Sequence, residues 1–114
     1  PAYAGVTLGL IHGSQPDAMV LCHDIGRTTI DGYPDYPIRP LTIAIDGYLA
    51  AAQLTNADAR FVGVCLNTSS IADHDEARIR LARIEAETGL PCCDPVRTGV
   101  APIVDALTRH WPSV

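Results

Sequence analysis

The chain contains no lysine, so all eight of its cationic side chains are arginines. For this segment, that absence excludes Schiff-base catalysis, a lysine general base and the lysine of a phosphate-binding loop. Clusters of basic residues are absent too, and the net charge is −5. An acidic chain without a basic patch binds nucleic acid poorly, so we expect no nucleic-acid partner.

Long apolar runs and paired cysteine motifs are also missing. No run approaches the roughly 20 residues that span a bilayer, and no secretory leader pattern is present, so we expect no membrane partner. The four cysteines show no C-x-x-C spacing, which excludes a zinc ribbon and a dithiol redox motif. We therefore expect no metal site, no disulfide framework and a reducing, cytoplasmic setting.

What is present is a chain of 114 residues, 47% of them hydrophobic, enough for one compact domain. It begins at Pro1 without a methionine, and we interpret it as a piece of a longer protein. Stretches with helical periodicity alternate with short apolar runs. Helices are predicted over 2–11 (a strand starting at Val6 is the alternative), 41–54 and 73–89, and a last helix capped by Thr98. Strands are predicted over 18–22, 61–66 and 91–94.

Several side chains are predicted to face inward or to end helices. Gly13 is expected to end the first helix, and Asp73 and Gly89 are expected to bound the third. The prolines between Asp24 and Pro40 predict a long loop without a regular helix or central strand. Apolar residues are expected to face inward on three helices: Leu41, Ile45, Tyr48, Leu49 and Ala52; Ala77, Leu81 and Ile84; Val100, Ile103, Val104 and Leu107.

Helices alternating with buried strands indicate an α/β fold with a parallel sheet. Two or three strands are too few for an ordinary independent sheet. We therefore expect a partial, doubly wound parallel sheet with helices on both faces, forming the latter part of a larger domain.

In open parallel sheets, ligands bind beyond the carboxyl ends of the strands, which selects segments 23–40, 67–70 and 94–99. In the first segment Arg27 can bind a phosphate or carboxylate. His23, or one of Asp24, Asp31 and Asp35, can act as acid or base. The alternative is that the tyrosines and prolines only pack the loop while Arg27 pairs with an aspartate inside it.

Two further residues follow later strands. Asn67 has an amide able to pair with a purine edge, although a turn residue bonding its own backbone is the simpler interpretation. Arg97 is either an anion clamp or a partner of Asp94.

Several strings of the sequence resemble the bacterial D-glutamate N-acetyltransferase-like family, long catalogued as a domain of unknown function, over nearly the whole chain. The tyrosine–proline loop at 30–37 is a specific signal. The strings are 1–14, 22–24 with Gly26-Arg27, 30–37, 63–64 with 66–68, and 94–97 with Gly99.

The resemblance implies a Rossmann-like upstream domain and a C-terminal domain similar to phosphate-loop NTPases, particularly dethiobiotin synthetase. This chain would be the latter part of that C-terminal domain, without the upstream phosphate-binding loop and not catalytic alone. The implied activity is acetyl transfer from acetyl-CoA to the amine of D-glutamate, with Asn67 reading the adenine. The resemblance supplies no catalytic assignment, so we infer the remaining site residues from the chemistry of the loops. The expected catalytic residues are His23 and Asp31. The expected substrate- or anion-binding residues are Arg27, Tyr33, Asp35 and Arg97.

Two other functions stay open. The likeness to dethiobiotin synthetase favours an ATP- and Mg²⁺-dependent ligase or kinase, for which Asp24 or Asp31 would supply the carboxylate. A non-catalytic regulatory or assembly module is the third interpretation. The expected partners are a small-molecule substrate and the rest of the same polypeptide, and a homo-oligomer stays open.

Overall fold

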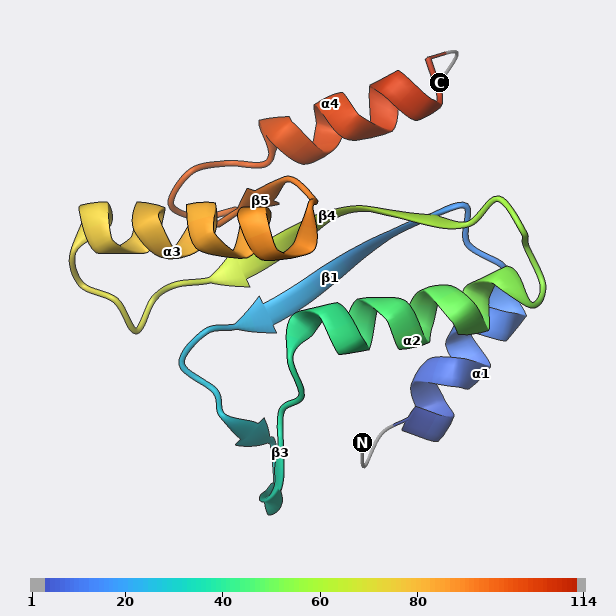
Figure 1. The fold of residues 1–114 in the computed structure, drawn as a ribbon, viewed down its shortest axis with the longest axis horizontal. Helices are drawn as coiled ribbons and strands as arrows, with labels where there is room; N and C mark the ends of the chain where they lie inside the picture. Colours follow the sequence, from blue (N-terminus) through green and yellow to red (C-terminus); the bar gives the residue numbers. More distant parts are fainter. Residues whose placement is uncertain (1–3, 113–114) are drawn as a thin grey trace. The chain divides into compact units, whose positions relative to one another are not determined.

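The computed structural model describes residues 4–112 as an α/β arrangement (Figure 1). Two compact units form, one from residues 4–19 and 27–60 and the other from residues 20–26 and 61–112. The elements in chain order are α1 (Ala4–Ser14), β1 (Ala18–Asp24), β2 (Thr29–Ile30), β3 (Tyr33–Pro37), α2 (Leu41–Gln53), β4 (Arg60–Asn67), α3 (His74–Thr88), β5 (Cys92–Cys93) and α4 (Ala101–His110).

The main sheet has the strand order β1-β4-β5. β4 and β5 are parallel, with Val64 beside Cys92 and Cys65 beside Cys93. β1 and β4 run in the same direction in Figure 1. All three predicted strands are therefore present, and the predicted α/β fold with a parallel sheet is confirmed.

Burial follows the place of each strand in the sheet. The central strand β4 buries Val62, Val64 and Leu66, as its apolar run predicts. For β1 the expectation of burial on both faces is wrong, because Val20 is 38% exposed and Cys22 is also exposed. Among the described residues β1 is an outer strand, and an outer strand has only one paired neighbour.

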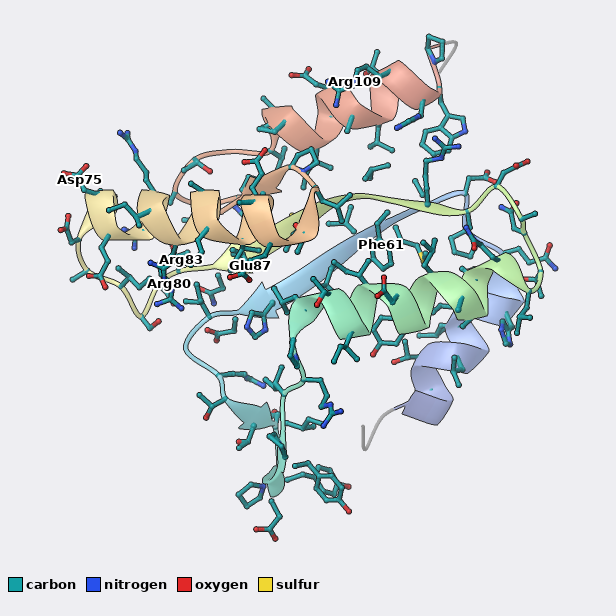
Figure 2. All side chains as sticks on the ribbon, viewed as in Figure 1. Phe61, Asp75, Arg80, Arg83, Glu87 and Arg109 are labelled. Atoms are coloured by element: carbon teal, nitrogen blue, oxygen red, sulfur yellow. The ribbon has the colours of Figure 1, made fainter. Side chains whose placement is uncertain are left out.

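Helix α3 matches the prediction at both ends and on its buried face. The Asp73 carboxylate accepts a hydrogen bond from the Asp75 N–H at 3.0 Å, and Gly89 closes the helix at φ 70°. Its buried residues are Ala77, Leu81 and Ile84. Asp75, Arg83 and Glu87 of α3, labelled in Figure 2, are exposed, whereas Arg80 is half-buried.

Helices α3 and α4 both contact β5. A Cβ atom added to Gly63 would lie 2.5 Å from Cγ1 of Ile103, so α4 covers the Gly63 face of β4 closely. Cys92, in register with Val64 on the opposite face, contacts Thr88 of α3. Successive strand residues point to opposite faces, so the two helices cover opposite faces of this part of the sheet.

The prediction for the start of α4 is wrong in two respects. Its N-cap is Val100 rather than Thr98, because the Thr98 hydroxyl donates to the Asp94 carbonyl and accepts from the Asp94 N–H, both at 3.1 Å. Val100 and Val104 were expected inside but are 44% and 50% exposed. The residues of α4 that are buried are Ile103 and Ala106.

In the other unit, α1 packs against α2. The predicted first helix is confirmed from Ala4 onward, and its first two predicted residues, 2 and 3, lie outside the described residues. His12 Nε2 lies 3.0 Å from the carbonyl oxygen of Ala51 in α2. On α2, Ile45 and Ala52 are buried and the other residues of its predicted face are half-buried. The expected end at Gly13 is wrong, since α1 continues to Ser14 and Gln15 takes the left-handed conformation at φ 48°.

The segment predicted as an irregular loop contains a small antiparallel hairpin. Thr29 of β2 pairs with Pro37 of β3, and Ile30 pairs with Tyr33. Gly32 turns the chain at φ 77°. The prolines do not prevent this pairing, because each strand of a two-stranded ribbon has an unpaired edge on which a missing N–H costs nothing.

Candidate functional site

The carboxyl ends of the three parallel strands bring three loops of one unit together. The Ile25 N–H after β1 donates to the Asn67 carbonyl of β4 at 3.1 Å. The Thr68 N–H after β4 donates to the carboxylate of Asp94, the residue after β5, at 3.0 Å. The candidate site is this edge, formed by residues 24–26, 67–74 and 94–97 and called the carboxyl edge below.

Asp94 is the most buried charged residue of the carboxyl edge, with only 4% of its surface exposed. Its Oδ2 atom accepts from both the N–H and the hydroxyl of Thr68. Its Oδ1 atom accepts from the backbone N–H groups of Val96 at 3.0 Å and Arg97 at 3.1 Å. The carboxylate therefore joins the loop after β4 to the loop after β5.

The charge state of Asp94 follows from those four bonds. Burial alone would raise the pKa of the Asp94 carboxyl, because a charged group loses hydration. The hydrogen bonds from Thr68, Arg97 and Val96 favour the charged form and together hold the pKa of Asp94 below its ordinary value. Asp94 is thus a carboxylate at neutral pH, with a structural use for both oxygens.

Arg97 is predicted as an anion ligand or a partner of Asp94. Its side chain forms hydrogen bonds with other residues of the carboxyl edge. Nη2 donates to the carbonyl oxygens of Thr68 at 3.1 Å and Ile71 at 2.6 Å. Nη1 lies 3.2 Å from Nδ1 of His74. The bond to the Asp94 carboxylate comes from the Arg97 backbone, and anion binding by its other donors stays a prediction.

Asn67 forms the hydrogen bond within a turn that its simpler interpretation predicts, and this bond leaves the side-chain Nδ2 group unused. Its Oδ1 atom accepts from the Ser69 N–H at 2.9 Å, and the side chain is exposed. No hydrogen bond to the Nδ2 group is present in the described part of the chain. An amide with one occupied oxygen lone pair and two available donors can still pair with a purine edge, so this role stays a prediction.

The loops after β1 and β4 approach closely at a glycine. A Cβ atom at Gly26 would lie 3.0 Å from Oγ of Ser70 and 3.3 Å from Oδ1 of Asp24. The Asp24 Oδ1 atom accepts from the Gly26 N–H at 2.9 Å. Glycine at position 26 therefore lets the first two loops of the carboxyl edge pack together.

His23 precedes Asp24 in β1, so the two side chains point to opposite faces of the sheet. Burial lowers the pKa of the His23 imidazole below its ordinary value, and the nearby Asp24 carboxylate opposes this effect. The imidazole is therefore neutral at pH 7 and has a lone pair that can accept a proton.

The remaining predicted residues lie on or beside the hairpin of the other unit. Nη1 of Arg27 is 3.8 Å from Oδ2 of Asp31, and the two side chains are 51% and 79% exposed. Tyr33 and Tyr36 meet edge to face, with ring centroids 5.9 Å apart. Asp35 is exposed. The structure thus brings Arg27 and Asp31 together, whereas the roles of Arg27, Asp31, Tyr33 and Asp35 in ligand binding or catalysis stay predictions.

Sequence reasoning missed Thr68 and Ser70 and assigned Asp94 only as a partner of Arg97. The signal was present, because Thr68 and Asp94 are the first residues after two apolar strands. Polar residues at these positions meet at one edge of a parallel sheet. What the sequence does not reveal is that Thr68 and Asp94 bond to each other.

Three cysteines lie on neighbouring strands at this end of the sheet. Cys65 lies between Cys22 and Cys93, and burial raises the pKa of all three thiols above the ordinary value. Burial also raises the pKa of Cys92 to about 11. Within residues 4–112, no group of three or more His, Cys, Asp or Glu side chains is arranged to hold a metal ion, and no helix is long and apolar enough to cross a membrane.

Known proteins resemble this chain over most of its length. Residues 1–104 match the family described as "Domain of unknown function (DUF1611_C) P-loop domain". A protein of Tritonibacter scottomollicae named "D-glutamate N-acetyltransferase" is 43% identical over 106 residues, which cover 93% of this chain and 32% of the relative. A protein of a Pseudoalteromonas species with the same name is 46% identical over 106 residues, covering 91% of this chain and 31% of the relative.

A solved structure agrees with these relatives. The crystal structure of a DUF1611 family protein from Anabaena variabilis has a TM-score of 0.80 and 41% sequence identity, over 90% of this chain and 30% of that protein. The chain thus spans about a third of the length of the proteins it matches. The family match covers most of the chain, carboxyl edge included. The chain belongs to the DUF1611_C P-loop domain family, and the predicted family relationship is confirmed.

Proposed function

We propose that this chain is the C-terminal part of an N-acetyltransferase that transfers the acetyl group of acetyl-CoA to the amine of D-glutamate or a similar amino acid. The observation that carries the proposal is the name of two relatives that share 43% and 46% identity with it. Their matched regions cover 91–93% of this chain. The rest of the longer polypeptide supplies the phosphate-binding loop and the further strands that complete a doubly wound sheet.

The residues of the carboxyl edge fit one end of acetyl-CoA. The amide of Asn67 has two donors for the ring nitrogens of adenine, and its exposed position leaves room for a flat base. In the other unit, Arg27 is our candidate for binding a phosphate or carboxylate, because guanidinium groups bind both well. Tyr33 and Asp35 of β3 are further candidates for contacts with a substrate.

Acetyl-CoA supplies the acetyl group as a thioester. The amine must lose a proton as its nitrogen bonds the acetyl carbon and the carbon–sulfur bond breaks. His23 is the stronger candidate for the base, because its lowered pKa keeps it neutral at pH 7. Asp31 is the other candidate, although its 79% exposed side chain lies in an open environment.

The test is an assay of the full-length protein with acetyl-CoA and D-glutamate, in which free thiol is followed with a chromogenic disulfide. We expect thiol release that depends on both substrates. L-glutamate serves as the matched control for stereochemistry. Absence of thiol release above background, with D-glutamate and with other amino-acid acceptors, would contradict the proposal.

A second candidate is an ATP- and Mg²⁺-dependent ligase or kinase, which the P-loop description of the family favours. Asp24 or Asp31 would then supply the carboxylate toward the metal, and Oδ1 of Asp24 also accepts from the Gly26 N–H. Calorimetric titration of the full-length protein distinguishes the two functions. Tight binding of acetyl-CoA with no heat from Mg·ATP supports acetyl transfer, and the reverse result supports the ligase or kinase.

A further inference from the structure

The side chain of Arg97 is engaged with backbone atoms of the loop after β4. Its Nη2 atom donates to the carbonyl oxygens of Thr68 and Ile71, at 3.1 and 2.6 Å. The Ile71 N–H donates to that same Thr68 carbonyl at 2.9 Å, so one guanidinium nitrogen clamps both ends of a tight turn. Nδ1 of His74, 3.2 Å from Nη1, must accept this bond because a guanidinium has no acceptor.

The backbone of Arg97 is fixed by the same network. Its N–H donates to Oδ1 of Asp94, whose Oδ2 atom holds the N–H and hydroxyl of Thr68. Thr68 is therefore held on its amide side by the buried carboxylate and on its carbonyl side by the guanidinium. Both contacts come from the loop after β5.

The turn held in this way carries the exposed polar groups of the carboxyl edge. Asn67 directly precedes Thr68, and its Oδ1 atom is bonded to the Ser69 N–H within the turn. Ser70, also in the turn, lies against Gly26 of the neighbouring loop. A rotation of the Thr68–Ile71 turn would therefore move the Asn67 amide.

We propose that Arg97 is a positioning residue, which holds the Thr68–Ile71 turn so that Asn67 presents its amide to the adenine of the acetyl donor, rather than a ligand of a substrate anion. The inference rests on the proposed function in assigning Asn67 to the donor. The positioning role and the anion-ligand role predict effects on different substrates. A positioning residue acts on the acetyl donor through Asn67, whereas a carboxylate ligand acts on the amino acid.

Arg97→Lys is the informative substitution, because lysine retains the charge but loses the planar fork that reaches two carbonyls. In the full-length protein we expect the KM for acetyl-CoA to rise about tenfold, the effect of losing one hydrogen bond. The KM for D-glutamate and the kinetics with S-acetylpantetheine, a donor without adenosine, should not change. Arg83→Lys, on the exposed face of α3, is the matched control.

A double substitution tests whether Arg97 acts through Asn67. Asn67→Ala alone should raise the KM for acetyl-CoA, and adding Arg97→Lys should raise it little further. A rise in the KM for D-glutamate, or independent effects of the two substitutions on the KM for acetyl-CoA, would overturn the proposal.

Hydrogen exchange gives a readout that does not depend on activity. Without ligand, Arg97→Lys should lower the protection of the Ile71 amide about tenfold while the Val64 amide, bonded to the Pro91 carbonyl, keeps its protection. Unchanged protection of Ile71 would refute the positioning role. Loss of protection in a protein that transfers no acetyl group would refute only the proposed function.

Discussion

At the scale of single residues, Asp94 is where the structure concentrates buried polar bonds. Replacing it in Asp94→Asn removes the charge and faces an amide group toward N–H donors. We expect the free energy of unfolding to fall by about 1.5–3 kcal/mol, the usual size of a hydrogen-bond contribution from a charged group. Urea denaturation of the full-length protein measures it, with Asp105→Asn on the exposed side of α4 as control. Equal stabilities of the two variants would contradict the role of Asp94.

The same carboxylate predicts a pH dependence of stability. The pKa of Asp94 is lower in the folded protein than its ordinary value, so the folded state binds its proton less readily than the unfolded chain does. The stabilisation is therefore complete above the unfolded pKa and is lost as the pH falls through the folded pKa. Denaturation at a series of acidic pH values should show a shallower loss of stability in Asp94→Asn than in the unsubstituted protein.

His23 predicts a change in turnover rather than in stability. If it is the base, His23→Gln should lower kcat at least about 100-fold, and Asp31→Asn should lower it much less. Because burial lowers the pKa of His23, the activity should persist to pH values below the ordinary histidine pKa before it declines. A pH–rate profile checks both points. A large loss in Asp31→Asn with little loss in His23→Gln would assign the base to Asp31 instead.

Substitution of Arg27 distinguishes a role in ligand binding from a role in ordering the hairpin. Its contact with Asp31 is long and exposed, and exposed ion pairs contribute little to stability. Arg27→Lys should therefore leave the free energy of unfolding nearly unchanged while weakening substrate affinity or turnover by about 1.5–3 kcal/mol. A lowered melting temperature with unchanged turnover at saturating substrate would show that Arg27 only orders the hairpin.

At the scale of elements, the packing of α4 on β4 depends on a missing side chain. Gly63→Ala would place a methyl group 2.5 Å from Ile103 Cγ1 and 3.1 Å from the Pro91 carbonyl, so we expect it to cost about 1–3 kcal/mol. Ile103→Ala removes most of that conflict, and the double variant should lose less stability than the two single variants added together. Gly47→Ala in α2, where nothing lies within 4 Å, is the control and should not destabilise the protein. Additive losses would contradict the close contact.

The same elements show which parts of the fold are predictable from sequence. The apolar run of β4 and the ends of α3 follow from local rules, because burial and the Asp73 and Gly89 caps depend on neighbours in sequence. The hairpin β2–β3 was missed because its prolines suggest an irregular loop when pairing partners are unknown. The start of α4 was misplaced because Thr98, a good capping residue, is bonded to Asp94 instead.

In the candidate site too, some features follow from local sequence and others depend on tertiary contacts. The rule for parallel sheets selects the three loops from sequence, and Asn67 and Arg97 do lie on them. Thr68 donates to Asp94, 26 positions away, and accepts from Arg97, 29 positions away, so periodicity and spacing do not reveal these hydrogen bonds. Local patterns thus predict which loops meet at the carboxyl edge, and tertiary contacts determine which side chains of those loops are already engaged.

At the scale of the whole molecule, this chain spans about a third of the length of the relatives that it matches. It supplies a three-stranded parallel sheet and its carboxyl edge, while its relatives are about three times longer. The partly exposed residues of β1, Val20 among them, are consistent with further strands contributed by the rest of such a polypeptide. The proposed function is therefore assigned to the full-length protein, and the experiments on ligands use it.

In the proposed acetyltransferase, the carboxyl edge binds the acetyl donor. Hydrogen exchange of the full-length protein with and without saturating acetyl-CoA tests it most directly, because protection reports bound segments without assuming a catalytic mechanism. We predict increased protection of residues 67–70 and 94–97 with acetyl-CoA, none there with D-glutamate alone, and no change in the second half of α3. Protection by acetyl-CoA that appears elsewhere and leaves residues 67–70 and 94–97 unchanged would contradict the claim.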